Sequence, residues 1–272
     1  MTNGGQFSIF TDYMGQFNFP SLDPGYYTLE VDGDPQLFVP SSQGVQVYKG
    51  MPSVVALSLK YKPGASRPAP GDAVVSVAEL DKTIPEKARK EFKRGAQAAQ
   101  LGKTEEAIGH YRKALDIYPD FMMARNDLGT QLLATGHLDE AAEQLRLAVK
   151  LDAKAFNPQL NLGIVLARQQ QFAEAALALE KAIALSPQSA APRLYAGQAY
   201  AALGDAARAE KELKAAFDLG GPDYAVALFH LGHLYLNRGE RELARKSFEA
   251  YLGAAPGAAD AAQVRKLIGV LR

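Results

Sequence analysis

Two consecutive blocks of 34 residues decide the fold: NDLGTQLLATGHLDEAAEQLRLAVKLDAKAFNPQ at residues 126–159 and LNLGIVLARQQQFAEAALALEKAIALSPQSAAPR at residues 160–193. Each block has a Leu-Gly pair near its start, and an Ala follows the Gly twelve residues later. Outward from these blocks the Gly returns at Gly95, Gly197 and Gly232, the last after a step of 35 residues. Such a period predicts a helical solenoid whose units bury their apolar faces against one another.

Composition and charge set the broad limits. The 272 residues are 47% hydrophobic and 22% charged, which favours two ordered domains and is too apolar for a disordered chain. Thirty basic residues balance thirty acidic ones, so no overall field attracts nucleic acid or anionic lipid. Cysteine is absent, which excludes disulfides, thiolate metal sites and cysteine nucleophiles.

The sequence predicts no membrane-spanning helix, because no apolar run approaches about 18 residues. The opening residues Met1–Gly5 have neither a basic start nor an apolar stretch, so they are not a secretory signal as they stand. An artificial start, placed after a signal or a leading strand was removed, remains an open alternative.

The N-terminal part has the period of β-strands. From Phe7 to Tyr61, apolar residues alternate with polar ones, and turn sequences such as Asp23-Pro24-Gly25 and Asp32-Gly33-Asp34 separate the runs. Five or six short strands are expected here. Among them are runs around Phe17, around Leu29, around Val45 and around Leu57.

These strands resemble a known family. The residues that carry the resemblance are Thr11-Asp12, Gly15, Phe17, Phe19, Leu22, Pro24-Gly25, Tyr27, Leu29 and Val31, which look like the carboxypeptidase regulatory-like domain. The resemblance implies a small antiparallel β-sandwich of transthyretin-like (prealbumin-like) topology over residues 1–62. The usual leading strand is missing, so an open sheet edge and a homodimer through that edge are expected. The same resemblance favours the bacterial periplasm or cell envelope, with the cytoplasm as the alternative.

A linker rich in Pro and Gly is expected over residues 63–84, followed by repeats over 85–256 and a capping helix over 257–272. Thr83 and Glu86 have the spacing of a capping box that would open the first helix.

The repeats resemble the tetratricopeptide repeat, a helix–turn–helix unit of 34 residues. In the third unit the match is carried by Leu162-Gly163, Leu166, Ala175, Leu179, Ala182 and Pro187. The other four units have matching residues at most of these positions. Small Gly and Ala positions let neighbouring helices approach closely. Gly102, Gly136, Gly204 and Gly239 fall where the first helix of a unit needs a left-handed cap, and Gln170 in the third unit predicts a strained turn.

The resemblance implies a right-handed all-α superhelix (an α-solenoid) of five units, with a concave groove lined by the first helix of each unit. By register, the groove candidates are Phe92, Lys93, Asn126, Asp127, Thr130, Leu133, Leu160, Asn161, Ile164, Arg168, Leu194, Tyr195, Gln198, Phe229, His230, His233 and Asn237. This mixed stripe suits an extended or helical peptide whose backbone meets the amide side chains. The alternative is that part of the set is ordinary solvated surface.

Other kinds of site are poorly supported. A clamp for a C-terminal carboxylate would need cations where Ala191 and Tyr195 stand, and only Asn161 matches it. His230 and His233 could share a metal, but no third ligand is evident nearby, so no metal and no cofactor is expected. No phosphate loop, nucleophile elbow or His-Glu-x-x-His helix occurs.

The sequence therefore predicts a non-enzymatic scaffold that binds a protein or peptide in the groove, with no nucleic-acid partner. The second hypothesis is a cell-envelope adaptor whose β-sandwich binds carbohydrate or cell wall, with the repeats as a spacer. An enzyme ranks third.

Overall fold

The computed structural model describes residues 25–31, 38–39, 41–47, 60–61 and 84–271, and the chain divides into two units, Met1–Lys82 and Thr83–Arg272. In the first unit, β1 (Gly25–Val31) pairs antiparallel with β3 (Ser41–Val47), with Gly25 opposite Val47 and Val31 opposite Ser41. β2 (Phe38–Val39) pairs antiparallel with β4 (Lys60–Tyr61).

These strands include two of the predicted runs, those around Leu29 and Val45. The runs around Phe17 and Leu57 lie outside the described residues. The described strands form two separate two-stranded sheets, so the predicted sandwich is not shown.

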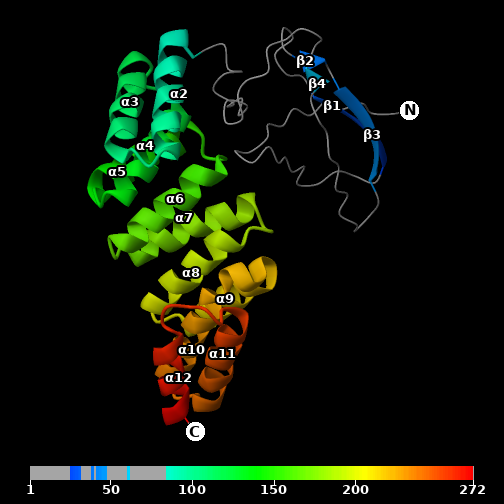
Figure 1. Ribbon diagram of the computed structural model, residues 1–272, viewed down its shortest axis with the longest axis vertical. Helices are drawn as coiled ribbons and strands as arrows, with labels where there is room; N and C mark the ends of the chain where they lie inside the picture. Colours follow the sequence, from blue (N-terminus) through cyan, green and yellow to red (C-terminus); the bar gives the residue numbers. More distant parts are fainter. Residues whose placement is uncertain (1–24, 32–37, 40, 48–59, 62–83, 272) are drawn as a thin grey trace. The chain divides into compact units, whose positions relative to one another are not determined.

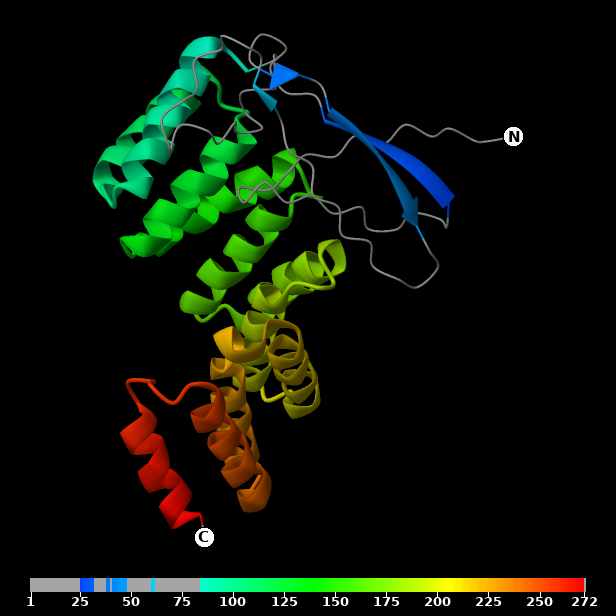
Figure 2. The same ribbon diagram turned by 45° about the vertical axis from the view of Figure 1, so that its right-hand side comes forward.

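Between residues 84 and 271 the chain is helical, and its helices form antiparallel pairs that follow one another along the array (Figures 1 and 2). The pairs are α2 (Glu86–Gln100) with α3 (Thr104–Ile117), α4 (Met122–Ala134) with α5 (Leu138–Leu151), α6 (Phe156–Arg168) with α7 (Phe172–Leu185), α8 (Ala190–Ala202) with α9 (Ala206–Gly220), and α10 (Val226–Asn237) with α11 (Arg241–Ala254). The 3₁₀ helix η1 (Gly221–Tyr224) precedes α10, and α12 (Ala261–Val270) packs against α11.

The recurring glycines are the points where the two helices of a pair meet. A Cβ atom on Gly163 would lie 2.5 Å from Cγ of Leu179, and one on Gly129 would lie 2.6 Å from Cγ of Leu145. The other three units repeat the arrangement, with these glycines and partners: Gly95 with Tyr111, Gly197 with Leu213, and Gly232 with Phe248. The close approach predicted at the glycines is confirmed, and the side chain that requires it stands sixteen residues later in every unit.

The turns inside the units also follow the prediction. Gly102, Gly136, Gly204 and Gly239 have φ between 71° and 81°, and Gln170 has φ of 61°. The Gln170 turn keeps the hydrogen bonds of the glycine turns, because Gln171 N donates to Leu166 O just as His137 N donates to Leu132 O. Gln170 therefore adopts a left-handed conformation that disfavours residues with a Cβ atom.

The ends of the array differ in how they are closed. α2 follows Pro85, and the capping box expected from Thr83 cannot be followed because Thr83 lies outside the described residues. α12 buries Ala261, Val264 and Ile268, and the Tyr251 hydroxyl donates to Asp260 Oδ1 at 2.6 Å. This end is covered by a short helix, as the sequence predicts.

Candidate interaction groove

The first helices of successive units lie against one another, because α4 contacts both α2 and α6, and α8 contacts both α6 and α10. At one register on these helices, the side chains of Asn161 and His230 bond to the helix before them. We call Asp127, Asn161, Tyr195 and His230 the ladder residues, since each stands at the same place in its unit.

Asn161 shows the contact most fully. Its Nδ2 donates to Asn126 Oδ1 at 3.0 Å and to Thr130 Oγ1 at 3.2 Å, so α6 is joined to α4 by two side-chain hydrogen bonds. The Thr130 hydroxyl in turn donates to the backbone oxygen of Asn126 at 3.0 Å. All three side chains are partly buried, and the structure brings these three predicted groove residues together.

His230 repeats the contact on α10. Its Nε2 lies 2.7 Å from Nε2 of Gln198 on α8. Because an amide nitrogen only donates, the imidazole nitrogen accepts, which requires the neutral ring. Burial lowers the pKa of His230, and the nearby His233 lowers it further. Phe229 stacks edge-on against His233, with ring centroids 4.5 Å apart.

Asp127 differs from the other ladder residues because it carries a charge. Its carboxylate accepts one hydrogen bond, from Asn126 Nδ2 at 3.0 Å. The Asp127 side chain is half-buried. Burial raises the pKa of the Asp127 carboxyl to about 6, and the bond from Asn126 opposes part of that shift. The negative charge also raises the pKa of the Tyr111 hydroxyl, whose shift comes mainly from burial.

Of the remaining predicted residues, Leu133 and Leu160 are partly buried and Lys93 is exposed. Five others fall into two groups. Ile164 and Tyr195 are partly buried on α6 and α8, whereas Arg168, His233 and Asn237 are exposed near the ends of α6 and α10. No hydrogen bond within the described residues joins these five side chains to the network of Asn161.

Two groove predictions are wrong. Phe92 is only 3% exposed, and its ring packs 4.8 Å from that of Phe121 and 5.6 Å from that of Tyr111. Leu194 is likewise in the core. Register alone placed both in the groove, but an apolar side chain at this position turns inward when the neighbouring helices leave room for it.

The sequence reasoning missed a polar position on the first helices. Arg193 donates from Nη2 to Pro187 O at 2.9 Å, and its Nη1 pairs with Glu212 at 2.7 Å. Arg125 stands two units earlier and makes the matching bond from Nε to Pro119 O at 2.9 Å. The sequence signal for this contact is an Arg six residues after each of these prolines. Its role is to hold the helix ends.

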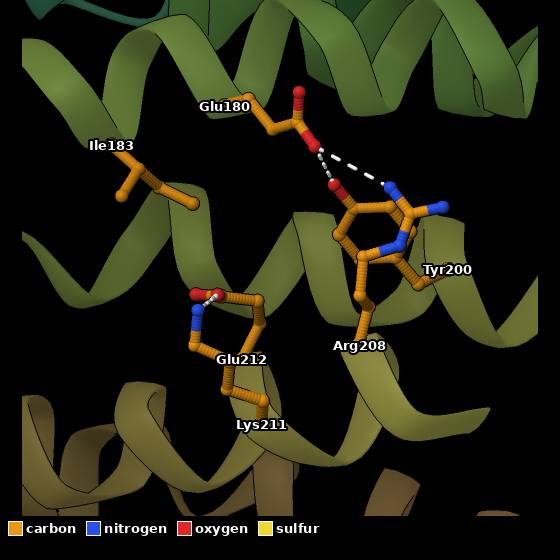
Figure 3. A pocket seen from close by; sticks show the side chains of 6 residues that line it. All are labelled: Glu180, Ile183, Tyr200, Arg208, Lys211 and Glu212. Atoms are coloured by element: carbon orange, nitrogen blue, oxygen red, sulfur yellow. Dashed lines mark hydrogen bonds and ion pairs between the residues drawn. The ribbon is translucent and has the colours of Figure 1, made fainter. Parts of the chain in front are cut away.

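A pocket of about 230 Å³ lies between α7 and α9, with Tyr200 from α8 on one side (Figure 3). Its charges are already paired: Glu180 accepts from the Tyr200 hydroxyl, the Arg208 guanidinium lies 4.4 Å from the Tyr200 ring centre, and Lys211 pairs with Glu212 at 3.4 Å. These internal pairs give the pocket a structural role.

Two further findings concern the described residues. They contain no group of three or more His, Cys, Asp or Glu side chains placed to hold a metal ion. None of their helices combines the length and the apolar character that crossing a membrane needs.

Comparisons with known proteins agree with this geometry. A family model described as tetratricopeptide repeat matches residues 92–158, 126–190 and 194–259, and a second one with the same description matches 166–221. No curated protein matches the chain.

Several solved structures share the fold. MamA (41-end) from Desulfovibrio magneticus RS-1 is 20% identical with a TM-score of 0.60, covering 65% of this chain and 99% of that one. YrrB, described as a TPR protein with an unusual peptide-binding site, is 22% identical with a TM-score of 0.58, covering 70% and 96%. PilF from Pseudomonas aeruginosa is 22% identical with a TM-score of 0.58, covering 70% and 86%. At these identities the likeness shows the fold alone.

Proposed function

This chain belongs to the tetratricopeptide repeat family, and from that premise we propose that it is a non-enzymatic scaffold that binds a peptide or protein segment along its first helices. The network of Asn126, Thr130 and Asn161 is the observation that carries the proposal. It holds amide groups in fixed positions on neighbouring helices, where they can meet the backbone of an extended segment. The peptide-binding site described for YrrB, a neighbour in fold, supports the same use of the array.

The proposed binding surface comprises eleven of the predicted groove residues that lie outside the core. They are Asn126, Asp127, Thr130, Asn161, Ile164, Arg168, Tyr195, Gln198, His230, His233 and Asn237. Several are only partly exposed, so a bound segment would contact the edges of the ladder rather than a deep cavity.

Crosslinking capture from the native cell tests this proposal. A groove variant with Asn126→Ala, Asn161→Ala and Tyr195→Ala is compared with a control variant that carries Glu105→Ala, Asp116→Ala and Lys181→Ala on exposed positions of the second helices. We expect a partner that the unmodified chain and the control capture equally and that the groove variant loses. Equal recovery by all three proteins would place the binding surface elsewhere.

We further propose that residues 1–62 form a β-sandwich like the carboxypeptidase regulatory-like domain, in a protein of the periplasm or cell envelope. The antiparallel pairing of β1 with β3 supports an antiparallel β domain. Light scattering on residues 1–75 tests the homodimer expected from an open sheet edge, and a well-ordered monomer would contradict it. Deleting residues 1–74 tests the adaptor alternative: the scaffold proposal requires that partner capture survives.

A further inference from the structure

The ladder residues differ in what the preceding helix offers them. Asn161 finds Asn126 and Thr130 on α4, and His230 finds Gln198 on α8. The positions 34 residues before Asn126 and Thr130 are Phe92 and Ala96 on α2. Neither of these side chains has a polar atom. Asp127 therefore has no side-chain partners at the positions where Asn161, one unit later, finds Asn126 and Thr130.

Within the described residues, Asp127 also lacks a cation. The side-chain amide of Asn126, which donates to Asp127, carries no charge, and no described ion pair includes the Asp127 carboxylate. The neighbouring Arg125 is bound elsewhere, since its Nη1 donates to Gln144 Oε1 at 2.7 Å and its Nε to Pro119 O. A half-buried carboxylate without an opposite charge is costly, because desolvation is not offset by a Coulombic partner.

The side-chain amide of Asn161 has an acceptor atom that is not in use. Asn161 uses its Nδ2 for both bonds to α4, which leaves the carbonyl Oδ1 as an acceptor. Among the described groups, no donor to that oxygen is recorded. A peptide lying across α4 and α6 could therefore place a backbone N–H on Asn161 and a positive side chain on Asp127.

Resting on the function proposed above, we propose that the groove selects a peptide with a lysine or arginine side chain, which pairs with the Asp127 carboxylate while Asn161 accepts from the peptide backbone. An acidic segment at this position is disfavoured, because it would meet a like charge at a partly desolvated site. Specificity thus comes from the Asp127 carboxylate, which no described cation pairs with.

The test uses the full chain and a phage-displayed library of random 12-residue peptides as the probe. Peptides are selected on the unmodified chain, synthesised, and measured by calorimetry against the unmodified chain, Asp127→Asn and Asp116→Asn. Asp127→Asn keeps the acceptor for Asn126 but removes the charge. Asp116→Asn removes the same charge from an exposed position on α3 and serves as the control. Circular dichroism confirms that each variant is folded.

We expect the selected peptides to share a Lys or Arg. Replacing it with norleucine or citrulline should weaken binding to the unmodified chain and to Asp116→Asn about tenfold, and change binding to Asp127→Asn less than about twofold. Peptides that depend on Asn126, Asn161 and Tyr195 but show no preference for a basic residue would overturn this inference and leave the proposed function intact. If no peptide is selected, or if the triple groove variant binds equally well, the proposed function fails and the inference fails with it.

Discussion

A glycine and a bulky side chain sixteen residues later form the basic packing contact of this protein. Leu179 occupies the space that a side chain on Gly163 would need, and at 2.5 Å from its Cγ atom either the leucine or the helix would have to shift. The five pairs explain why glycine recurs at this position although it weakens a helix.

Gly163→Ala should therefore lower the free energy of unfolding by about 1–3 kcal/mol, because the new methyl group would overlap Leu179. Urea denaturation measures the change. In a background that already carries Leu179→Ala, the same substitution should cost nothing further. Gly253→Ala in the last turn of α11 is the control: its Cβ would meet nothing within 4 Å, so it should leave stability unchanged or raise it by up to about 0.5 kcal/mol. An equal loss for both alanines would contradict the packing argument.

Asp127 predicts a distinctive dependence of stability on pH. Its pKa in the folded state, about 6, exceeds the ordinary value of 3.8, so folding disfavours the charged form. The contribution of this group to stability is complete below about pH 4 and is lost as the pH rises through about 6.

Asp127→Asn should then be more stable than the unmodified chain at pH 7.5, by about 1–2 kcal/mol after allowance for partial exposure, and the difference should shrink toward pH 4. Denaturant titrations at several pH values measure this. A gain in stability together with a loss of basic peptides is what a binding residue produces when it is retained at a cost to the fold. A variant that is less stable at every pH would refute the expected sign.

At the scale of single elements, the turn between α6 and α7 is the strained one. Gln170 adopts the left-handed conformation that glycine occupies in the other four units. Gln170→Gly should raise the free energy of unfolding by up to about 1 kcal/mol, and the reverse change Gly136→Gln should lower it by about 1–2 kcal/mol. Thermal unfolding of the two variants checks this, and a destabilising Gln170→Gly would mean that the glutamine side chain makes a compensating contact.

The helix α12 closes the C-terminal end of the array. Ending the chain at Gly257 would remove the buried side chains of Val264 and Ile268 and the hydrogen bond from Tyr251. We expect a loss of about 3 kcal/mol, concentrated in the last unit. Hydrogen exchange should show faster exchange in α10 and α11 than in the full chain and unchanged exchange in α4 and α5. Uniform loss of protection would show instead that the array unfolds as one body.

Much of each helix pair could be predicted from the sequence, because glycine and proline have local backbone requirements that do not depend on distant residues. The turn glycines, the strained Gln170 and the positions of Pro119 and Pro187 just beyond helix ends are of this kind. The residues that line the groove were harder to predict from the sequence. Whether Phe92 faces solvent or the core depends on the size of Tyr111 and Phe121 around it, and the bonds of Asn161 depend on what the preceding helix presents.

At the scale of the whole molecule, the 34-residue repeat in the sequence predicted the helical array. The N-terminal unit has no such repeat to predict its fold. Alternation identifies a strand but does not specify its partners, so the pairing of β1 with β3 could not be derived from the sequence. Most of the residues that carried the sandwich prediction lie outside the described part of the chain.

The two units predict independent folding. Residues 83–272 alone should retain a helical far-ultraviolet spectrum and a thermal midpoint close to that of the helical unit in the full chain, because the units form separate compact groups. Circular dichroism of the shortened and full-length proteins measures this. A fall of more than about 4 °C, equivalent to about 1 kcal/mol, would mean that the first unit stabilises the second.

Each glycine of the array meets a bulky residue of its own unit, so a gene segment encoding 34 residues would bring both members of that packing pair with it when duplicated. The lineage could lengthen or shorten the protein by whole units without inventing a new core. Among variants that arise this way, the number of units would vary far more freely than the spacing inside a unit.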